Sequence, residues 1–173
     1  MLKKILEIYR GKSTVNLKCT NGDIYDSSAT LRATGGAGPW AVWHSELVNT
    51  DHTIGYKGGI LAEGEYYGIV GYSSKGKRVI KLFLATDEQL AKIKTHEDLT
   101  AEMMTLPSNV PNPNHGGERW LRYVYIHEGY RTEDGSHGCL TIYRYPIEPA
   151  KVSDYQMLMD SLQDNEIINI KLT

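Results

Sequence analysis

The stretch Thr14-Val-Asn-Leu-Lys-Cys-Thr-Asn-Gly22 shows which kind of secondary structure opens this chain. Val15, Leu17 and Cys19 alternate with polar residues, so their side chains share one face of an extended strand. Asn-Gly is typical of a tight β-hairpin turn, and residues 24–33 can then return as the partner strand. The chain therefore begins as β-structure, and the alternation places Cys19 on the core-facing side as a small apolar residue.

Further strands are predicted along the rest of the chain. A glycine-rich, irregular stretch over residues 35–59 separates them from the first hairpin. Runs of β-branched and aromatic residues bounded by turn residues mark each strand. The strands are expected over residues 66–72, 79–84, 120–126 and 167–172. The first two of these flank Ser73-Ser-Lys-Gly-Lys77 and form a second predicted hairpin.

Helical signals appear only in the second half of the chain. Thr86-x-x-Gln89 is a capping box that predicts one short helix, and residues 96–104 are expected to form another. Ser153-x-x-Gln156 predicts a late helix. The apolar face of that helix comprises Tyr155, Leu158, Met159 and Leu162. Short helices within a mostly extended chain predict a mainly β, α+β fold in a single domain over residues 1–173.

Composition and charge limit the classes of partner. The chain has 19 Lys and Arg against 21 Asp and Glu, a net charge of −2, so no nucleic-acid partner is expected. No apolar run approaches about twenty residues, so no transmembrane segment is expected. Glu7 and Arg10 interrupt the apolar start, which therefore does not read as a signal peptide. The chain either stays where it is made, leaves by a route without a cleavable signal, or is shortened.

The chemically informative window is Tyr125-Ile-His-Glu-Gly-Tyr-Arg-Thr-Glu-Asp-Gly-Ser-His-Gly-Cys-Leu140. A strand ends with His127, a polar loop follows, and Ser136-His-Gly-Cys139 closes that loop. A thiol becomes a good nucleophile when it loses its proton, which a nearby imidazole can accept. The backbone amides around Gly138 can stabilise an oxyanion. These residue types are compatible with acyl chemistry on a cysteine.

A zinc site is the alternative for the same side chains. The candidate ligands are His127, His137 and Cys139 together with the distant His44, His52 or His115. No Cys-x-x-Cys or His-Glu-x-x-His spacing accompanies them, so we expect neither a metal nor another cofactor. Two cysteines are also too few for a disulfide scaffold.

Two parts of this window carry a family resemblance: the string Ser136-His-Gly-Cys139 before an aliphatic residue, and the strand-borne pair Ile126-His127 upstream. Together they resemble the catalytic signature of the L,D-transpeptidase family, and Ile60-Leu-Ala-Glu-Gly-Glu-Tyr-Tyr67 is a weaker match to the same fold. The resemblance implies a bacterial peptidoglycan enzyme built on a β-sandwich or barrel with a few short helices. The residues that it implies are Cys139 as nucleophile, His127 as base, and Ser136, His137 and Gly138 around the oxyanion hole and substrate pocket.

The resemblance further implies a reaction on peptidoglycan stem peptides through a thioester on Cys139. An amine acceptor would give cross-linking or D-amino-acid exchange, and water would give L,D-carboxypeptidase hydrolysis. A cationic side chain near the site can hold a substrate carboxylate, and aromatic side chains can line a groove. The residues expected to bind substrate are Tyr130, Arg131, Arg144, Trp40 and Trp43.

The window also departs from the main family. Eight residues separate His127 from the Ser-His-Gly-Cys string, Glu128 and Gly129 follow the histidine, and Thr141 replaces the usual Arg or Asn. This spacing is more similar to short, signal-less relatives that contact-dependent secretion systems inject as antibacterial effectors. We therefore expect action in the periplasm or cell wall, with an immunity protein or secretion machinery as further partners. Two other classes stay open: a non-catalytic peptidoglycan-binding or phage-structural module, and another cysteine amidase or peptidase.

Overall fold

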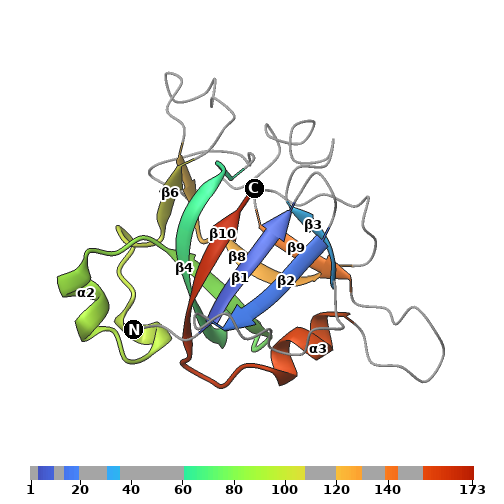
Figure 1. The fold of residues 1–173 in the computed structure, drawn as a ribbon. Helices are drawn as coiled ribbons and strands as arrows, with labels where there is room; N and C mark the ends of the chain where they lie inside the picture. The colour runs from blue at the N-terminus through green and yellow to red at the C-terminus, as the bar shows by residue number, and fades with distance from the viewer. Residues whose placement is uncertain are drawn as a thin grey trace.

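The computed structural model describes residues 4–9, 14–19, 31–35, 61–107, 120–129, 139–143 and 154–173. These segments form a closed β-barrel, a small second sheet and short helices (Figure 1). Around the barrel, the strands are β1 (Lys4–Tyr9), β10 (Ile167–Leu172), β4 (Gly64–Tyr72), β5 (Arg78–Phe83), β8 (Tyr125–Gly129), β9 (Leu140–Tyr143), β3 (Leu31–Gly35) and β2 (Thr14–Cys19). The prediction of a mainly β, α+β fold is confirmed.

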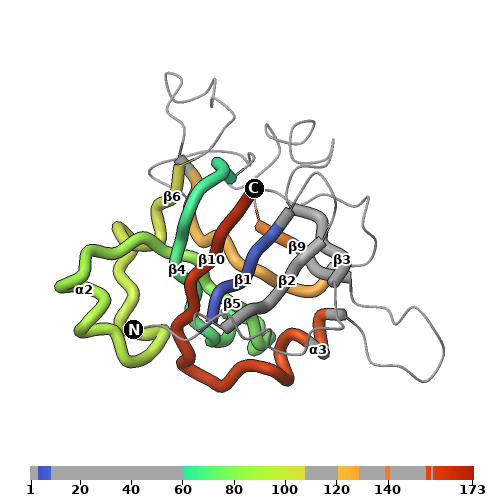
Figure 2. Tube along the Cα trace, viewed as in Figure 1, coloured from blue at the N-terminus to red at the C-terminus, as the bar shows by residue number. Residues whose placement is uncertain are grey.

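The two ends of the chain close the barrel. β1 pairs in parallel with β10, with Ile5 opposite Asn169, and pairs antiparallel with β2 on its other side. Figure 1 shows β1 lying between these two strands, and Figure 2 shows β1 beside β10. The sequence patterns did not predict β1, because the adjacent apolar residues Ile5 and Leu6 obscure its alternation. The predicted last strand, β10, is confirmed with its expected bounds.

Alternate residues of the barrel strands fill its interior. The buried inward residues include Leu6, Ile8, Val70, Ile80, Leu82, Ile126, Leu140, Ile168 and Ile170. Gly68 lies on the same face of β4, where a Cβ atom would lie 2.5 Å from Cδ1 of Ile170 and 2.7 Å from Cγ2 of Ile80. A glycine here therefore lets side chains of the two neighbouring strands approach each other across β4.

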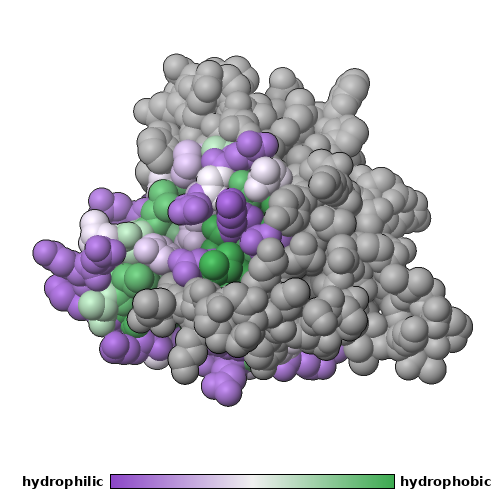
Figure 3. Space-filling view, viewed as in Figure 1, coloured by the Kyte–Doolittle hydropathy of each residue, from purple (hydrophilic) through white to green (hydrophobic). Residues whose placement is uncertain are grey.

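A second apolar cluster covers the outer face of β4 and β5. Ile69, Phe83 and Ile93 are buried there, beneath α2 (Asp87–Lys92) and the 3₁₀ helix η2 (His96–Asp98). The predicted capping box of α2 is confirmed, since the Gln89 N–H donates to Thr86 Oγ1 at 3.2 Å and the Thr86 N–H donates to Gln89 Oε1 at 2.9 Å. Figure 3 shows hydrophilic residues along the edge of the molecule where α2 lies.

The other helix predictions hold in part. The helix expected over 96–104 is limited to η2, and turns follow it over 101–104. The late helix α3 spans Asp154–Asp160, and its expected apolar face is buried. Among the described residues, no helix has the length and apolar character needed to cross a bilayer.

Two strand predictions are corrected by the backbone. The strand expected over 120–126 is broken at Tyr123, whose φ of 56° is left-handed, so β7 (Trp120–Arg122) pairs with β6 (Thr105–Pro107) while β8 joins the barrel. β2 and β3 are antiparallel as expected, but Val15 pairs with Leu31. A two-residue Asn-Gly turn would pair Val15 with Ser28, so the observed register differs from the predicted one by three residues. The predicted turn itself lies outside the described residues.

We expect the substitution Gly68→Ala to destabilise the barrel by about 1–3 kcal/mol, the usual cost of adding volume to a packed core. The new methyl group would displace the ends of Ile170 and Ile80. Urea unfolding measures the effect, with Ser74→Ala in the exposed β4–β5 turn as the control. Equal midpoints for Gly68→Ala and the unsubstituted chain would show that the two isoleucines move aside without cost.

Candidate functional site

The pairing of β8 with β9 brings His127 and Cys139 together. The two strands run parallel, with Ile126 opposite Leu140, and both of these side chains are fully buried in the barrel interior. Successive residues of a strand point to opposite faces, so His127 and Cys139 lie on the outer face. One register position earlier, Cys139 lies beside Tyr125, whose backbone N–H donates to the Cys139 Sγ at 3.4 Å.

The thiol of Cys139 has several polar neighbours. Besides the Tyr125 amide, it lies 3.8 Å from the backbone carbonyl oxygen of Tyr123, to which an S–H group can donate. It also shares a hydrogen bond with the side chain of His127. The Tyr125 amide and the Tyr123 carbonyl thus place one backbone donor and one backbone acceptor at the sulfur.

A backbone carbonyl orients the His127 ring. Its Nδ1 lies 2.8 Å from the carbonyl oxygen of Glu128. A carbonyl oxygen only accepts, so Nδ1 must carry the proton of this bond, which leaves Nε2 as the ring nitrogen available to Cys139. The group that orients the imidazole, which the sequence left open, is therefore the main chain of the next residue. An orienting group, a base and a thiol in sequence form the arrangement that nucleophilic catalysis requires.

The pKa of His127 lies above its ordinary value of 6.5. Burial of the ring acts to lower this pKa. The hydrogen bond to Cys139, the charge of its thiolate and the carbonyl and carboxylate of Glu128 outweigh that effect. The imidazolium form of His127 is therefore more favoured here than in a free histidine.

Sequence reasoning missed two tyrosines beside the thiol. Tyr123 is 40% exposed and holds the left-handed backbone that directs its carbonyl toward Cys139. Such a conformation is uncommon for a bulky residue and clusters at functional sites. The ring of Tyr125 lies 5.7 Å from the Nζ of Lys81, and the pKa of its phenol is raised by burial and then by the charges of Cys139 and Tyr123. The sequence carries no signal for the Tyr123 backbone angle.

A pocket of about 640 Å³ opens on the His127 side of this pair. Its walls are the β4–β5 turn, the start of β5, the residues Tyr125, His127 and Glu128 of β8, and α3. Cys139 is not among the residues that line it. His127 therefore borders the pocket, whereas Cys139 does not.

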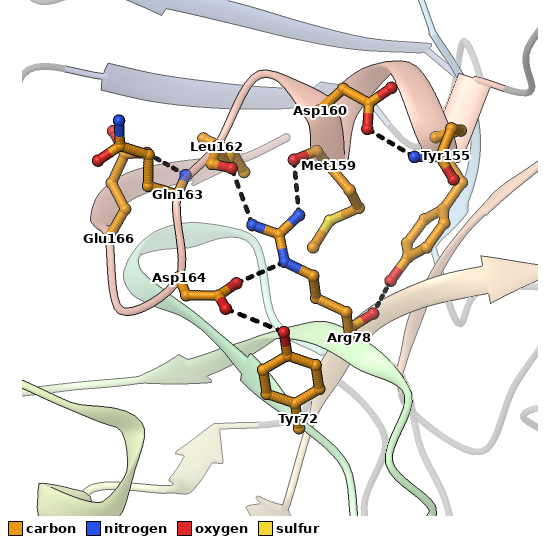
Figure 4. A network of polar contacts seen from close by, with 10 residues as sticks. Tyr72, Arg78, Tyr155, Met159, Asp160, Leu162, Gln163, Asp164 and Glu166 are labelled. Atoms are coloured by element: carbon orange, nitrogen blue, oxygen red, sulfur yellow. Dashed lines mark hydrogen bonds and ion pairs between the residues drawn. The ribbon is translucent and has the colours of Figure 1, made fainter.

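A network of polar contacts fixes α3 as one wall of this pocket (Figure 4). Arg78 donates from Nη1 to the Met159 carbonyl at 2.7 Å and from Nη2 to the Leu162 carbonyl at 2.8 Å. Its Nε donates to Asp164 Oδ1 at 2.7 Å, and the Tyr72 hydroxyl donates to Asp164 Oδ2 at 2.9 Å. These bonds satisfy carbonyls at the end of the helix and hold it against the β4–β5 hairpin.

Other expected site residues lie outside the described part of the chain. They are Trp40, Trp43, Tyr130, Arg131, Ser136, His137, Gly138 and Arg144. Within the described residues, no three His, Cys, Asp or Glu side chains are grouped so that they could hold a metal ion. A comparison with protein-family models, curated proteins and solved structures finds no match in any of the three.

We expect the titration of His127 to depend on the thiol. In the unsubstituted chain its imidazole should titrate above pH 6.5. Cys139→Ala removes the hydrogen bond and the charge that raise the pKa and leaves the burial that lowers it, so the pKa should fall. NMR of the ring C–H protons against pH measures this, with His127→Gln identifying the resonance and Cys19→Ala as the control. An unchanged pKa in Cys139→Ala would contradict the hydrogen-bonded pair.

We expect Asp164 to contribute stability that acid removes. The hydrogen bonds from Arg78 and then Tyr72 hold its pKa below the ordinary 3.8. Because the pKa of Asp164 is lower in the folded state than in the unfolded state, its carboxylate adds to the free energy of unfolding at pH values above the ordinary pKa. This contribution is lost as the pH falls through the lowered pKa of the folded state. Asp164→Asn should therefore lower the melting temperature at pH 7 and flatten its decline below about pH 4. In the control Glu102→Gln, the melting temperature should fall with pH as steeply as in the unsubstituted chain. An equally steep fall in Asp164→Asn would contradict the role of the Asp164 carboxylate.

Proposed function

We propose that this chain is a peptidoglycan-modifying cysteine enzyme of the L,D-transpeptidase type that acts on stem peptides. The observation that carries the proposal is the hydrogen bond between His127 and Cys139, with the Glu128 carbonyl on the other nitrogen of the ring. The Ser-His-Gly-Cys string, which carries the family resemblance, is a second observation in support of the proposal. A barrel with few short helices is also in keeping with the fold that the resemblance implies.

In the acylation step, Nε2 of His127 takes the thiol proton and Sγ of Cys139 attacks the carbonyl that joins the third and fourth residues of the stem. The S–C bond forms as the C–N bond to the terminal residue breaks. His127 returns the proton to the leaving amine, so the terminal amino acid departs neutral at its nitrogen. The Tyr125 amide, 3.4 Å from Sγ, stabilises the thiolate before the attack.

In the second step the thioester is resolved by an amine or by water. His127 takes a proton from the incoming nucleophile, the new C–N or C–O bond forms, and the C–S bond breaks. An amine gives cross-linking or amino-acid exchange, and water gives carboxypeptidase hydrolysis. The amides of Gly138 and Cys139 are the proposed donors to the oxyanion in both steps.

The proposal includes a place of action. Mature stem peptides lie outside the inner membrane, so the chain would act in the periplasm or cell wall. The compact His127–Cys139 spacing favours an injected antibacterial effector, with secretion machinery and an immunity protein as partners.

Acylation tests the proposal directly. We expect a carbapenem to add its mass to the chain at Cys139, and we expect Cys139→Ala to abolish both the adduct and turnover of muropeptides. His127→Ala should slow acylation by about 10²–10⁴-fold, the usual value of a positioned base. Mass spectrometry reads the adduct, and Cys19→Ala is the matched control. Turnover that survives Cys139→Ala would disprove the nucleophile, and a chain that binds muropeptides without any adduct would be a non-catalytic module.

Targeting the chain to different compartments tests its place of action. We expect expression in the cytoplasm of a Gram-negative host to be harmless, because the substrate is not there. The same chain behind a secretory signal should inhibit growth or distort cell shape, and Cys139→Ala should not. Growth curves and microscopy read the result. Toxicity from the cytoplasm, or toxicity that persists without the thiol, would contradict the proposed substrate.

A further inference from the structure

A row of three side chains crosses the outer face of the barrel from Cys139. The β8–β9 register places Tyr125 beside Cys139, and the β5–β8 register places Lys81 opposite Tyr125. All three project outward, because the residue that follows or precedes each of them in its strand is buried in the barrel interior. Neighbouring strands lie about 4.8 Å apart, so Lys81 lies about 10 Å from Cys139. The row therefore places a lysine on the same surface as the thiol.

Two aromatic rings position the ammonium group of Lys81. Its Nζ lies 5.7 Å from the centre of the Tyr125 ring and 3.4 Å from Nδ1 of His96. The His96 side chain packs directly on Gly71 of β4, where a Cβ atom would lie 2.8 Å from both Cβ and Cγ of His96. The backbone N–H of His96 donates to Asn165 Oδ1 at 3.4 Å. A glycine in β4 thus lets the imidazole of η2 approach the barrel wall closely enough to meet Lys81.

The ammonium group of Lys81 keeps hydrogen-bonding capacity for a ligand. It carries three N–H donors, of which the His96 ring can accept one. Among the described residues no carboxylate forms an ion pair with it, and Glu97 acts only as a more distant charge. Burial lowers the pKa of Lys81, as expected for a cation that is partly removed from water. Such a cation attracts an anion more strongly than a fully exposed one does.

The position of the base limits the direction in which an acyl donor extends from the thiol. His127 is the next outward residue of β8 after Tyr125, and it protonates the leaving amine, so the leaving group lies on the His127 side. The acyl part must extend elsewhere, and the row offers it a path across Tyr125. Two residues of extended peptide span about 7 Å, and the Lys81 side chain can cover the remaining distance.

We infer that Lys81 is a specificity-determining residue whose ammonium group binds a free carboxylate on the second residue of the stem peptide. The inference rests on the proposed function and deepens it, because it names the acyl donor as an anionic stem. A stem with a carboxamide at the same place offers no charge to Lys81. Such a stem binds more weakly and reacts by the same chemical steps.

The test compares two acyl donors that differ only in that carboxylate. The chain is incubated with disaccharide tetrapeptides whose second residue carries either a free carboxylate or a carboxamide. Liquid chromatography and mass spectrometry quantify the released terminal amino acid. Lys81→Gln should raise the KM for the carboxylate donor about tenfold, near the lower end for a hydrogen bond between charged groups, and change kcat less than about twofold. The KM for the carboxamide donor should change less than about twofold, and the control Lys92→Gln in α2 should change neither KM.

Two further variants separate the charge of Lys81 from its packing. Lys81→Met keeps an aliphatic chain beside Tyr125 and removes the charge, so it should reproduce the KM change of Lys81→Gln. Lys81→Arg keeps the charge and should keep the preference for the carboxylate donor. Iodoacetamide, a neutral reagent, should alkylate Cys139 at the same rate in all these variants. A changed rate would overturn the inference, because Lys81 would then act through the thiol.

The remaining outcomes separate the inference from the proposed function. An equal change of KM for both donors would overturn the inference, since Lys81 would then only support Tyr125, and so would a KM that is insensitive to all three variants. Carbapenem acylation of the unsubstituted chain is measured in parallel. An adduct without donor discrimination would defeat the inference alone. No adduct and no turnover of either donor would defeat the proposed function, and the inference with it.

Discussion

The parallel pairing of β8 with β9 is the constraint on which the site depends. Ile126 and Leu140 are paired and fully buried, so a shift by one residue would move both from the core to the surface. The hydrophobic interior therefore fixes the register. Because Cys139 is adjacent to Leu140 and His127 is adjacent to Ile126, the same register fixes the position of Cys139 relative to His127. The packing of two buried aliphatic residues thus positions the two side chains of the candidate site.

Three backbone groups contact the side chains of His127 and Cys139. The Glu128 carbonyl orients the His127 ring, the Tyr125 amide donates to the sulfur, and the Tyr123 carbonyl lies on its other side. All three groups belong to one continuous stretch that includes the left-handed residue Tyr123. The break at Tyr123 lets Arg122 belong to the small β6–β7 sheet while Tyr125, three residues further on, joins the barrel. The strained backbone and the site geometry are thus parts of one feature.

The sequence predicted those features of the fold that depend on neighbouring residues, and it did not predict those that depend on residues far apart in the chain. The β4–β5 hairpin, the Thr86 capping box and the apolar face of α3 depend on neighbouring residues, and the sequence predicted them. β1 pairs with β10 across the whole length of the chain, and no local pattern carries that information. In the site, the side chains of His127 and Cys139 were visible in the sequence. The orienting group was not, because every residue has a carbonyl and only the fold shows which one faces the ring.

The basic residues of the β4–β5 hairpin differ in how they contribute to the structure. Arg78 uses its Nε and both Nη atoms on Asp164 and on the Met159 and Leu162 carbonyls, so its guanidinium is committed to holding α3. A ligand in the pocket would have to break that network to bind it. Lys75 and Lys77 lie in the adjoining turn, whose form is fixed by backbone bonds and does not depend on their ammonium groups. The wall that shapes the pocket therefore depends on the guanidinium of Arg78 and not on the ammonium groups of the turn.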